Sequence, residues 1–429
     1  MPVPRRLVLS VIMAVALGCS PRAARHQPAP DSTPDLRFDN GLWFDGSGFT
    51  RTSVFVDDGR LRFPRDPDET ARAATRVVDL RGRYVVPPFC EAHNHNLGLD
   101  SENNDEQIRS YLRDGVFYVK VLSNLPREAA AVWHTYNTPR SVDAQFANGG
   151  ITGPGGHPIR LRESLLARGL YTGFTRESLR NHAYYVIDSD TDIAALWPVI
   201  LQYRPDFLKL ILVYSEEYAK RRDDPAFFGE KGLSPQIFER IVQRARSFGL
   251  HVVAHVTSAH DFHVAVAAGV DNIAHLPGTR DVQRIDPADA AEAARRGITV
   301  TTTAVLINRL RERDPAAHVA IRDAQIANLQ LLKQAGVTLA VGSDEYDDTS
   351  VGEVTHLRSL AVFDNAELLR MWTTNCARTV FPDRRIGRLA DGYEASFLAL
   401  DGNPLDDFSM TSRIAMRVKD GRILEPEVR

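Results

Sequence analysis

The chain has 429 residues, of which 43% are hydrophobic, so it is long enough to bury one large core and a smaller module. Its formal net charge is −3, and no stripe of Lys and Arg residues alternates with aromatic residues. This balance excludes the basic surface on which nucleic-acid-binding proteins depend, and it is typical of a globular enzyme.

The first 19 residues predict a targeting segment rather than a part of the fold. Arg5 and Arg6 precede an apolar run over residues 7–17, which is too short to cross a bilayer as a mature helix. The run ends in Ala-Leu-Gly-Cys, which resembles a bacterial lipoprotein cleavage site with Cys19 as the acylated residue. We therefore expect a lipid-anchored protein on the periplasmic side of the cell envelope, with Ser20 favouring the outer membrane. The alternative is an ordinary signal peptide and a secreted protein.

Residues 20–34 are rich in proline and polar residues, a composition typical of an extended tether. Beyond the tether, the two ends of the chain carry similar motifs, with Asp-Gly between alternating apolar residues at 56–61 and again at 418–423. Asp-Gly in this setting is a strong hairpin signal, although such turns are also common by chance. We predict one small β-sandwich module assembled from residues 35–86 and 384–429.

The long region between these ends predicts parallel βα units. Ser234 and Pro235 begin a helix that Gly249 ends, and an apolar strand at 251–256 follows at once. The same pattern of helix, glycine and apolar strand recurs around Gly269, Gly297 and Gly336. Such repeats indicate a parallel sheet covered by helices, and about eight units fit into this region. We therefore predict an α/β fold, a (β/α)8 TIM barrel, over residues 87–383.

Polar residues lie at the ends of apolar runs in this region. They are His93, His95, Lys209, His255, His275 and Asp344. The carboxyl ends of the parallel strands meet at one rim of a barrel, where the active sites of this fold lie. His93 and His95, two residues apart on a strand, point to the same face and can bind one ion together. Taken singly, each residue more often has a structural role, but their joint pattern of type, order and position predicts a two-metal site.

The segments that carry these residues share a family pattern. They are VVPPFCEAHNHN, PDFLKLIL, VVAHV, DNIAHLPG and LAVGSD. Together with the tail RIGRLADGYEASFLALDGNPLDD, they make the chain resemble the amidohydrolase superfamily over nearly all of its mature length. The lysine on the fourth strand is similar to that of the binuclear branch, which includes prolidase-like dipeptidases and imidazolonepropionase-like enzymes. The stretches at 87–92 and 395–397 depart from the usual family sequences, but neither departure removes a ligand.

The resemblance implies a role for each of these residues. Lys209 is expected to be carboxylated, so that its carbamate bridges two divalent metal ions, with zinc the expected metal. One ion would be held by His93, His95 and Asp344, and the other by His255 and His275. A metal-bridging hydroxide would attack the substrate carbonyl. Asp344 would act as general base and then give the proton to the leaving amine.

The residues that bind substrate are expected in the loops after the strands. The segment around His157 resembles the third-strand loop that places a histidine near the substrate, although a solvent-facing histidine is equally compatible with the glycines there. In the loop after Lys209, Tyr214 and Tyr218 could reach a substrate carboxylate, with aromatic packing as the alternative. A group of acidic residues would attract a cationic substrate or simply be solvated: Glu345, Asp347, Asp348 and Glu353.

The predicted function is metal-dependent hydrolysis of an amide bond in a small molecule, either dipeptide-like or cyclic. The alternatives are a deaminase or lactonase on the same scaffold, and an envelope lipoprotein that holds metal without catalysis. Lys209 disfavours the mononuclear deaminases of the superfamily, and Asp344 disfavours metal storage, which needs no proton shuttle. We expect no nucleic-acid partner and membrane contact only through the lipid anchor, while a homo-oligomer is left open.

The chain holds three cysteines, so Cys90 and Cys376 remain once Cys19 is lipidated. The two could pair in an oxidising compartment, but nothing in the sequence brings them close together. We therefore expect both to be buried thiols.

Overall fold

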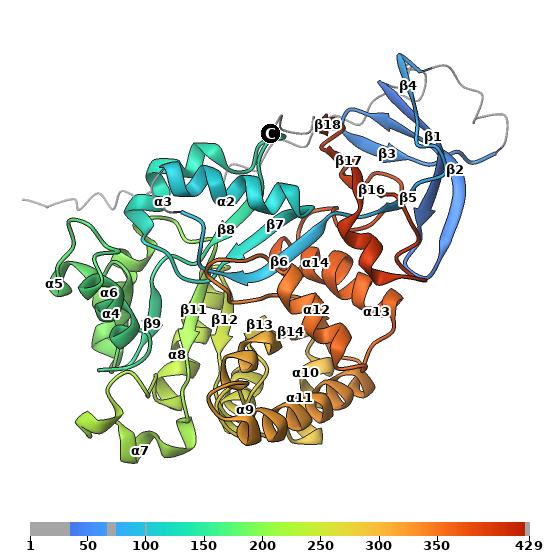
Figure 1. Cartoon of the computed structure of the whole chain (residues 1–429). Helices are drawn as coiled ribbons and strands as arrows, with labels where there is room; N and C mark the ends of the chain where they lie inside the picture. The colour runs from blue at the N-terminus through green and yellow to red at the C-terminus, as the bar shows by residue number, and fades with distance from the viewer. Residues whose placement is uncertain (1–34, 67–73, 99–100, 425–429) are drawn as a thin grey trace, which may run out of the picture.

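The computed structural model of the protein describes residues 35–66, 74–98 and 101–424 (Figure 1). The predicted targeting segment and tether, with Cys19, lie outside the described residues. In the described part of the chain, no helix combines the length and hydrophobicity needed to cross a membrane. Figure 1 shows a large body of parallel strands and helices, with a smaller β-rich module at one end.

The large body contains two parallel sheets. One is three-stranded, in the order β6 (Phe89–Asn94), β7 (Val116–Val121) and β8 (Asp143–Phe146). The other is seven-stranded, in the order β10 (Tyr184–Val186), β9 (Gly150–Thr152), β11 (Phe207–Ile211), β12 (His251–His255), β13 (Asn272–Ala274), β14 (Thr299–Thr301) and β15 (Thr338–Ala340). The strands are almost wholly buried, as expected when both faces of a parallel sheet are covered.

The helices alternate with these strands along the chain. Those in the first half are α2 (Ser101–Arg113), α3 (Pro126–Val132), α4 (Ile159–Ala167), α5 (Arg176–Leu179), α6 (Asp190–Leu201) and α7 (Tyr218–Arg221). Those in the second half are α8 (Pro235–Ser247), α9 (Ala259–Ala268), α10 (Pro287–Arg295), α11 (Pro315–Ala335), α12 (Val351–Ser359), α13 (Asn365–Arg370) and α14 (Cys376–Val380). Buried apolar side chains of strands and helices form one continuous core between them.

The predicted repeat of helix, glycine and strand is confirmed. The Ser234 side chain caps α8 by accepting from the Ile237 backbone N–H, and proline stands at the first helical position. Helices α9 and α11 end at Gly269 and Gly336, whose φ angles of 73° and 78° are left-handed conformations that favour glycine. These helix ends turn the chain directly into β13 and β15.

Backbone hydrogen bonds join the two sheets at two places. Ala92 in β6 donates to Val341, just after β15, at 2.9 Å, and Asp206, just before β11, donates to Phe146 in β8 at 2.9 Å. Strands β8 and β9 follow each other in the chain but belong to different sheets, and they pair with β7 and β11 respectively. The result is a TIM-barrel-like α/β fold. Strand β10, beside β9, is an addition that the sequence pattern did not predict.

The smaller module is one mixed sheet built from both ends of the chain. Its order is β18 (Arg422–Leu424), β17 (Ile414–Lys419), β16 (Phe397–Leu400), β5 (Tyr84–Val86), β1 (Leu36–Phe44), β2 (Phe49–Asp57) and β3 (Arg60–Arg62), with β4 (Arg76–Asp79) also paired to β1. Both predicted Asp-Gly hairpins form, joining β2 to β3 and β17 to β18. The module has its own apolar core. A two-layered sandwich stays a prediction.

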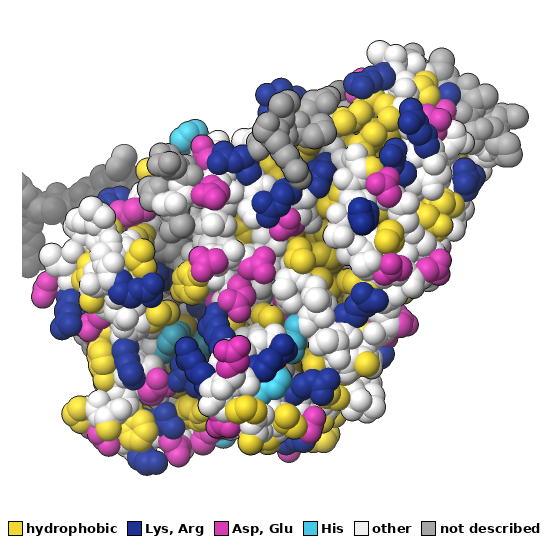
Figure 2. All heavy atoms as spheres, viewed as in Figure 1, with side chains coloured by type: hydrophobic (Ala, Val, Ile, Leu, Met, Phe, Trp, Pro, Cys, Tyr) yellow, Lys and Arg dark blue, Asp and Glu magenta, His cyan; other side chains and the backbone are white. Residues whose placement is uncertain are grey.

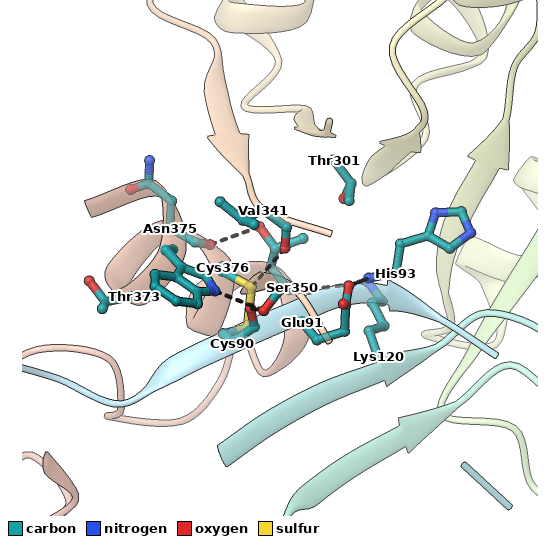
Figure 3. The surroundings of a disulfide bond; sticks show 12 residues. Cys90, Glu91, His93, Lys120, Thr301, Val341, Ser350, Thr373, Asn375 and Cys376 are labelled. Atoms are coloured by element: carbon teal, nitrogen blue, oxygen red, sulfur yellow. Dashed lines mark hydrogen bonds between the residues drawn. A yellow bond between two sulfur atoms is a disulfide. The ribbon is translucent and has the colours of Figure 1, made fainter. Parts of the chain in front are cut away.

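The prediction of two buried thiols is wrong, because Cys90 in β6 and Cys376 in α14 form a disulfide with a Cα–Cα distance of 5.7 Å (Figure 3). The cysteines are 286 residues apart in the chain, and only the packing of α14 against β6 brings them together. Trp372, just before α14, stacks on Phe89 with a centroid distance of 3.7 Å. The disulfide therefore joins the first parallel strand to the last helix.

We predict that the variant with both Cys90→Ala and Cys376→Ala is less stable than the wild type by about 2–4 kcal/mol, because the cross-link no longer restricts the unfolded chain. Urea unfolding followed by circular dichroism would measure the difference. Reductant should destabilise the wild type and leave the double variant unchanged. Reactive thiols at both positions in unreduced, urea-unfolded wild-type protein would contradict the disulfide.

Candidate active site

The six predicted residues converge at one end of the parallel strands. His93 and His95 come from β6 and the residue after it, Lys209 from β11, His255 from β12, and His275 and Asp344 from the residues that follow β13 and β15. Asp344 Oδ1 lies 3.1 Å from Nε2 of His95 and 3.5 Å from Nε2 of His93. The ring of His275 lies 4.4 Å from the rings of both His93 and His255, measured between centroids. The structure therefore assembles residues spread over about 250 positions of sequence into one cluster.

Three of these residues form a group suited to a single ion. Each of His93, His95 and Asp344 offers one ligand atom, and these atoms all lie within 4.8 Å of one another. Imidazole nitrogen and carboxylate oxygen are ligands that divalent transition metals prefer. His255 and His275 stand beside this group and could serve a second ion.

The buried histidines are neutral at physiological pH. Burial, with a further contribution from the nearby Lys209, lowers the pKa of His93 well below its usual value and lowers that of His275 to about 3. Burial and the neighbouring His275 lower the pKa of His255 in the same direction. A neutral imidazole has a free lone pair, which a metal ligand requires.

Lys209 is buried, with its side chain 3% exposed, and its amine Nζ lacks a hydrogen-bond partner within the described residues. Burial lowers the pKa of Lys209 to about 7, against the opposing effect of the Asp344 carboxylate. Such an amine is partly uncharged at neutral pH. Its missing partner is consistent with a site in which Lys209 binds a group that is not part of the protein chain. The unpaired Nδ1 of His93 fits the same interpretation.

Two histidines are oriented by contacts on the side of the ring away from the cluster. Nδ1 of His95 lies 3.1 Å from the carbonyl oxygen of Ser123, so this nitrogen carries the hydrogen and Nε2 faces Asp344 with its lone pair. Nδ1 of His275 lies 2.9 Å from the hydroxyl of Thr303. Such contacts hold each ring in a single orientation.

The sequence analysis missed Glu91, which fixes the backbone of the site. Its carboxyl accepts from the backbone N–H of His93 at 2.9 Å (Figure 3). It also accepts from the backbone N–H and the hydroxyl of Ser343, at 2.9 and 2.7 Å. Glu91 thus joins the strand that carries His93 to the segment that carries Asp344. The signal was present, because Glu91 and His93 stand two residues apart on one strand and so share a face.

Backbone strain concentrates at the same place. Asp344 and His275 have φ angles of 55° and 84°, and Tyr214 and Thr303 have φ angles of 49° and 44°. Residues other than glycine rarely adopt this left-handed region, and they do so most often at functional sites, where the surrounding structure holds them.

The three predicted substrate-binding residues are placed differently. The His157 ring stacks on His255 with a centroid distance of 4.9 Å, so His157 adjoins the cluster. Tyr214 lines a cavity of about 600 Å³ together with Arg280, whose charge acts on His157 and His255. The Tyr218 hydroxyl instead donates to Asp188 at 3.1 Å. Substrate binding by each of these residues stays a prediction.

Glu353 and Glu345, two of the four acidic residues that follow Asp344, have partners within the protein. Glu353 is fully buried, and its carboxylate accepts from the backbone N–H groups of Ala304 and Val305 at 2.9 and 2.7 Å. Glu345 is paired with Arg309 at 3.0 Å. In Figure 2, histidine side chains are visible in a hollow of the large body, with Lys and Arg side chains around it.

Known proteins resemble this chain in sequence and in fold. A sequence profile described as the amidohydrolase family matches residues 215–424. The imidazolonepropionase of Cupriavidus taiwanensis is 30% identical over 373 residues, covering 80% of this chain and 83% of that protein. The structure of Aspergillus niger ochratoxinase has a TM-score of 0.72 at 18% identity and covers 91% of this chain and 96% of its own. A prolidase complexed with N-methylphosphonate-L-proline has a TM-score of 0.69 at 19% identity, with coverage of 91% and 100%.

We predict that the metal-free protein loses stability as the pH falls below about 6.5, the ordinary pKa of histidine. The unfolded chain binds protons that the folded His93, His255 and His275 reject, so the free energy of unfolding rises with pH between about 3 and 6.5, by at most about 1.4 kcal/mol per pH unit for each histidine. Urea unfolding of chelator-treated protein across this range would measure the slope. His275→Asn should reduce the slope, and the exposed His134→Asn should not. Equal slopes in all three proteins would contradict the interpretation.

Proposed function

The chain belongs to the amidohydrolase superfamily and is a hydrolase of amide bonds, and from this premise we propose that it uses two divalent metal ions to cleave a dipeptide-like or cyclic amide substrate. The observation that carries the proposal is the convergence of four neutral or partly buried imidazoles, one carboxylate and one unpaired buried amine in a single cluster. The substrate class is supported by the imidazolonepropionase, ochratoxinase and prolidase relatives.

The residues divide into two groups of ligands. His93, His95 and Asp344 would hold one ion, and His255 and His275 the other, with zinc the expected metal. Lys209 would join the two groups after its uncharged Nζ attacks CO₂, forming a new N–C bond and releasing a proton to solvent. The lowered pKa of about 7 supports this reaction, because a neutral amine has the lone pair that the attack requires.

When bound, the two ions supply Lewis acidity and bring the pKa of a water molecule from ~15.7 to about 7. Asp344 receives a proton from the attacking water. Although burial raises the pKa of Asp344, the adjacent His95 and the charge of Lys209 lower it to about 2, so the carboxylate starts ionised. Asp344 then returns the proton to the leaving amine.

His157 has a supporting role in the proposal. Its ring packs against His255, and burial, with the charge of Arg280, lowers the pKa of His157 to about 3. A neutral imidazole has one N–H, which could donate to the substrate carbonyl oxygen and favour the build-up of negative charge there.

The proposal includes a closed barrel of eight strands. The hydrogen bonds of Ala92 with Val341 and of Asp206 with Phe146 support closure, because they join β6 to the segment after β15 and β8 to the residue before β11. Closure would hold the ends of β6 and β15 together, and these ends carry His93 and Asp344.

We also propose that the protein acts in the cell envelope, anchored through a lipid on Cys19. The disulfide between Cys90 and Cys376 supports this location, because disulfides persist in the oxidising periplasm and are rare in the cytosol.

We predict that the wild type, expressed with bicarbonate, binds about two metal ions per chain and hydrolyses members of a dipeptide and lactam panel. Asp344→Asn should keep the fold and reduce the rate by about 10²–10⁴-fold, since the proton acceptor is lost. Lys209→Ala should lose at least one ion and most of the activity, with partial rescue by added short carboxylic acids. Metal content by inductively coupled plasma mass spectrometry and amine release would be measured on the same samples.

A Lys209→Ala protein with two ions and undiminished activity would contradict the carbamate. Metal-independent turnover by the wild type would contradict the whole proposal. Lys333→Ala, which changes an exposed lysine on α11, is a suitable control.

We predict that Cys19→Ser moves the protein from the membrane fraction to the soluble fraction, because the site of acylation is removed. Immunoblotting of fractionated cells would measure the distribution, with Cys90→Ala as a control that leaves Cys19 intact. Unchanged fractionation of Cys19→Ser would contradict the lipoprotein interpretation.

A further inference from the structure

Arg162 is a buried cation close to the proposed site. It lies on α4, its side chain is 5% exposed, and its guanidinium donates to the hydroxyls of Tyr171 and, at 2.5 Å, of Ser123. Nε of Arg162 is buried without a hydrogen-bond partner among the described residues. Within the same part of the chain, no carboxylate forms an ion pair with Arg162, and the groups that act on its pKa are tyrosines.

Several other buried or neighbouring cations are instead paired with carboxylates. Buried Lys419 is paired with Asp143 at 2.7 Å, and Arg384 is paired with Asp143 and Glu394. Around the site, Arg309 is paired with Glu345 and Arg280 with Glu230. A buried charge is costly unless an opposite charge balances it, and an arginine, unlike a lysine, cannot become neutral.

The position of Arg162 connects it to the cluster. The Ser123 hydroxyl accepts from Arg162, and the carbonyl of the same residue contacts Nδ1 of His95 at 3.1 Å. On the other side, the ring of Tyr346 stacks on His95 with a centroid distance of 5.7 Å, and the charge of Arg162 acts on the Tyr346 hydroxyl. A single residue therefore stands between Arg162 and His95 on each of two sides, Ser123 on one and Tyr346 on the other.

The helix that carries Arg162 begins beside His157. Helix α4 starts at Ile159, directly after the His157–Pro158 pair, and the Arg162 backbone N–H donates to the Pro158 carbonyl at 2.9 Å. Because His157 stacks on His255, one short segment contacts His255 at one end and Ser123, the neighbour of His95, at the other. A small substrate that lies along this segment would meet both ends.

We propose that Arg162, with the hydroxyls of Tyr171 and Ser123, binds a carboxylate of the substrate. The proposal rests on the proposed function and narrows it to amides that carry a free carboxylate near the scissile bond. The planar guanidinium matches a carboxylate in two parallel hydrogen bonds, and the Tyr171 hydroxyl, which accepts from Arg162, keeps its own hydrogen for the anion. The bound carboxylate balances the buried charge.

The test compares two matched pairs of substrates. N-acetylphenylalanine and N-acetylphenethylamine differ by a carboxylate on the leaving amine, whereas N-succinylphenethylamine and N-butyrylphenethylamine differ by a carboxylate on the acyl group. The wild type should prefer the acid of one pair, and that pair identifies the side on which the carboxylate lies. Arg162→Met should lower kcat/KM for this acid by about 100-fold, mainly through KM, and leave its uncharged analogue within about threefold.

Three further variants separate binding from structure. Arg162→Lys should give an intermediate value, because lysine keeps the charge but not the planar fork. Tyr171→Phe, which removes one hydroxyl, should lower kcat/KM for the acid but not for its uncharged analogue. Arg160→Met removes an exposed arginine two positions earlier on α4 and should leave the preference unchanged. The proposal would be overturned if Arg162→Met lowered kcat/KM equally for the acid and its uncharged analogue. It would also be overturned if the wild type preferred neither acid to its analogue.

Binding of succinate separates this proposal from the proposed function. Isothermal titration calorimetry on the full metal-loaded chain should detect succinate binding in the wild type and in Arg160→Met, and a loss of at least about tenfold in affinity in Arg162→Met. If no amide is hydrolysed but this difference is found, the carboxylate site stands and the hydrolase proposal fails. Equal or absent succinate binding in all three proteins overturns the carboxylate site.

Discussion

The carboxyl of Glu91 holds together the two ends of the parallel-strand region. By accepting from the backbone of His93 and from both donors of Ser343, it joins β6 to the segment after β15 at the level of the cluster. The adjacent backbone bond from Asp344 to the His93 carbonyl, at 2.8 Å, extends the same contact. Burial raises the pKa of Glu91 to about 8, and its oxygens accept these bonds with or without the proton. The separation of His93 from Asp344 depends on this contact, and so does the left-handed backbone of Asp344.

Burial then decides the electrostatics of the site. The same exclusion of water makes the histidines neutral, lowers the pKa of Lys209 to about 7, and leaves the permanent charge of Arg162 with no anion from the described chain. Among the six residues of the cluster, the carboxylate of Asp344 is the one negative charge. The site is therefore short of negative charge, and both a carbamate on Lys209 and a substrate carboxylate at Arg162 would supply it. Each proposal therefore adds a negative charge to the same buried site, one at Lys209 and the other at Arg162.

The module at the end of the barrel-like body is attached by different means. Asp143 in β8 accepts from Lys419 of β17 and from Arg384, both at 2.7 Å, and Arg384 also pairs with Glu394. Within the large body, the disulfide adds a covalent link between β6 and α14 (Figure 3). The strained residues Asp344 and His275 lie instead at the ends of the strands that carry the six-residue cluster.

The sequence by itself determined the parallel βα pattern, the two Asp-Gly hairpins and the six residues of the cluster, because periodicity, glycine positions and short motifs are local properties. It also contained Glu91 at the right spacing from His93. Only the tertiary structure decided the pairing of Cys90 with Cys376 and the burial of Glu353, since both depend on elements far apart in the chain. The isolation of Arg162 from carboxylates was equally invisible, because an arginine on a polar helix has the same local pattern whether its charge faces solvent or a buried site.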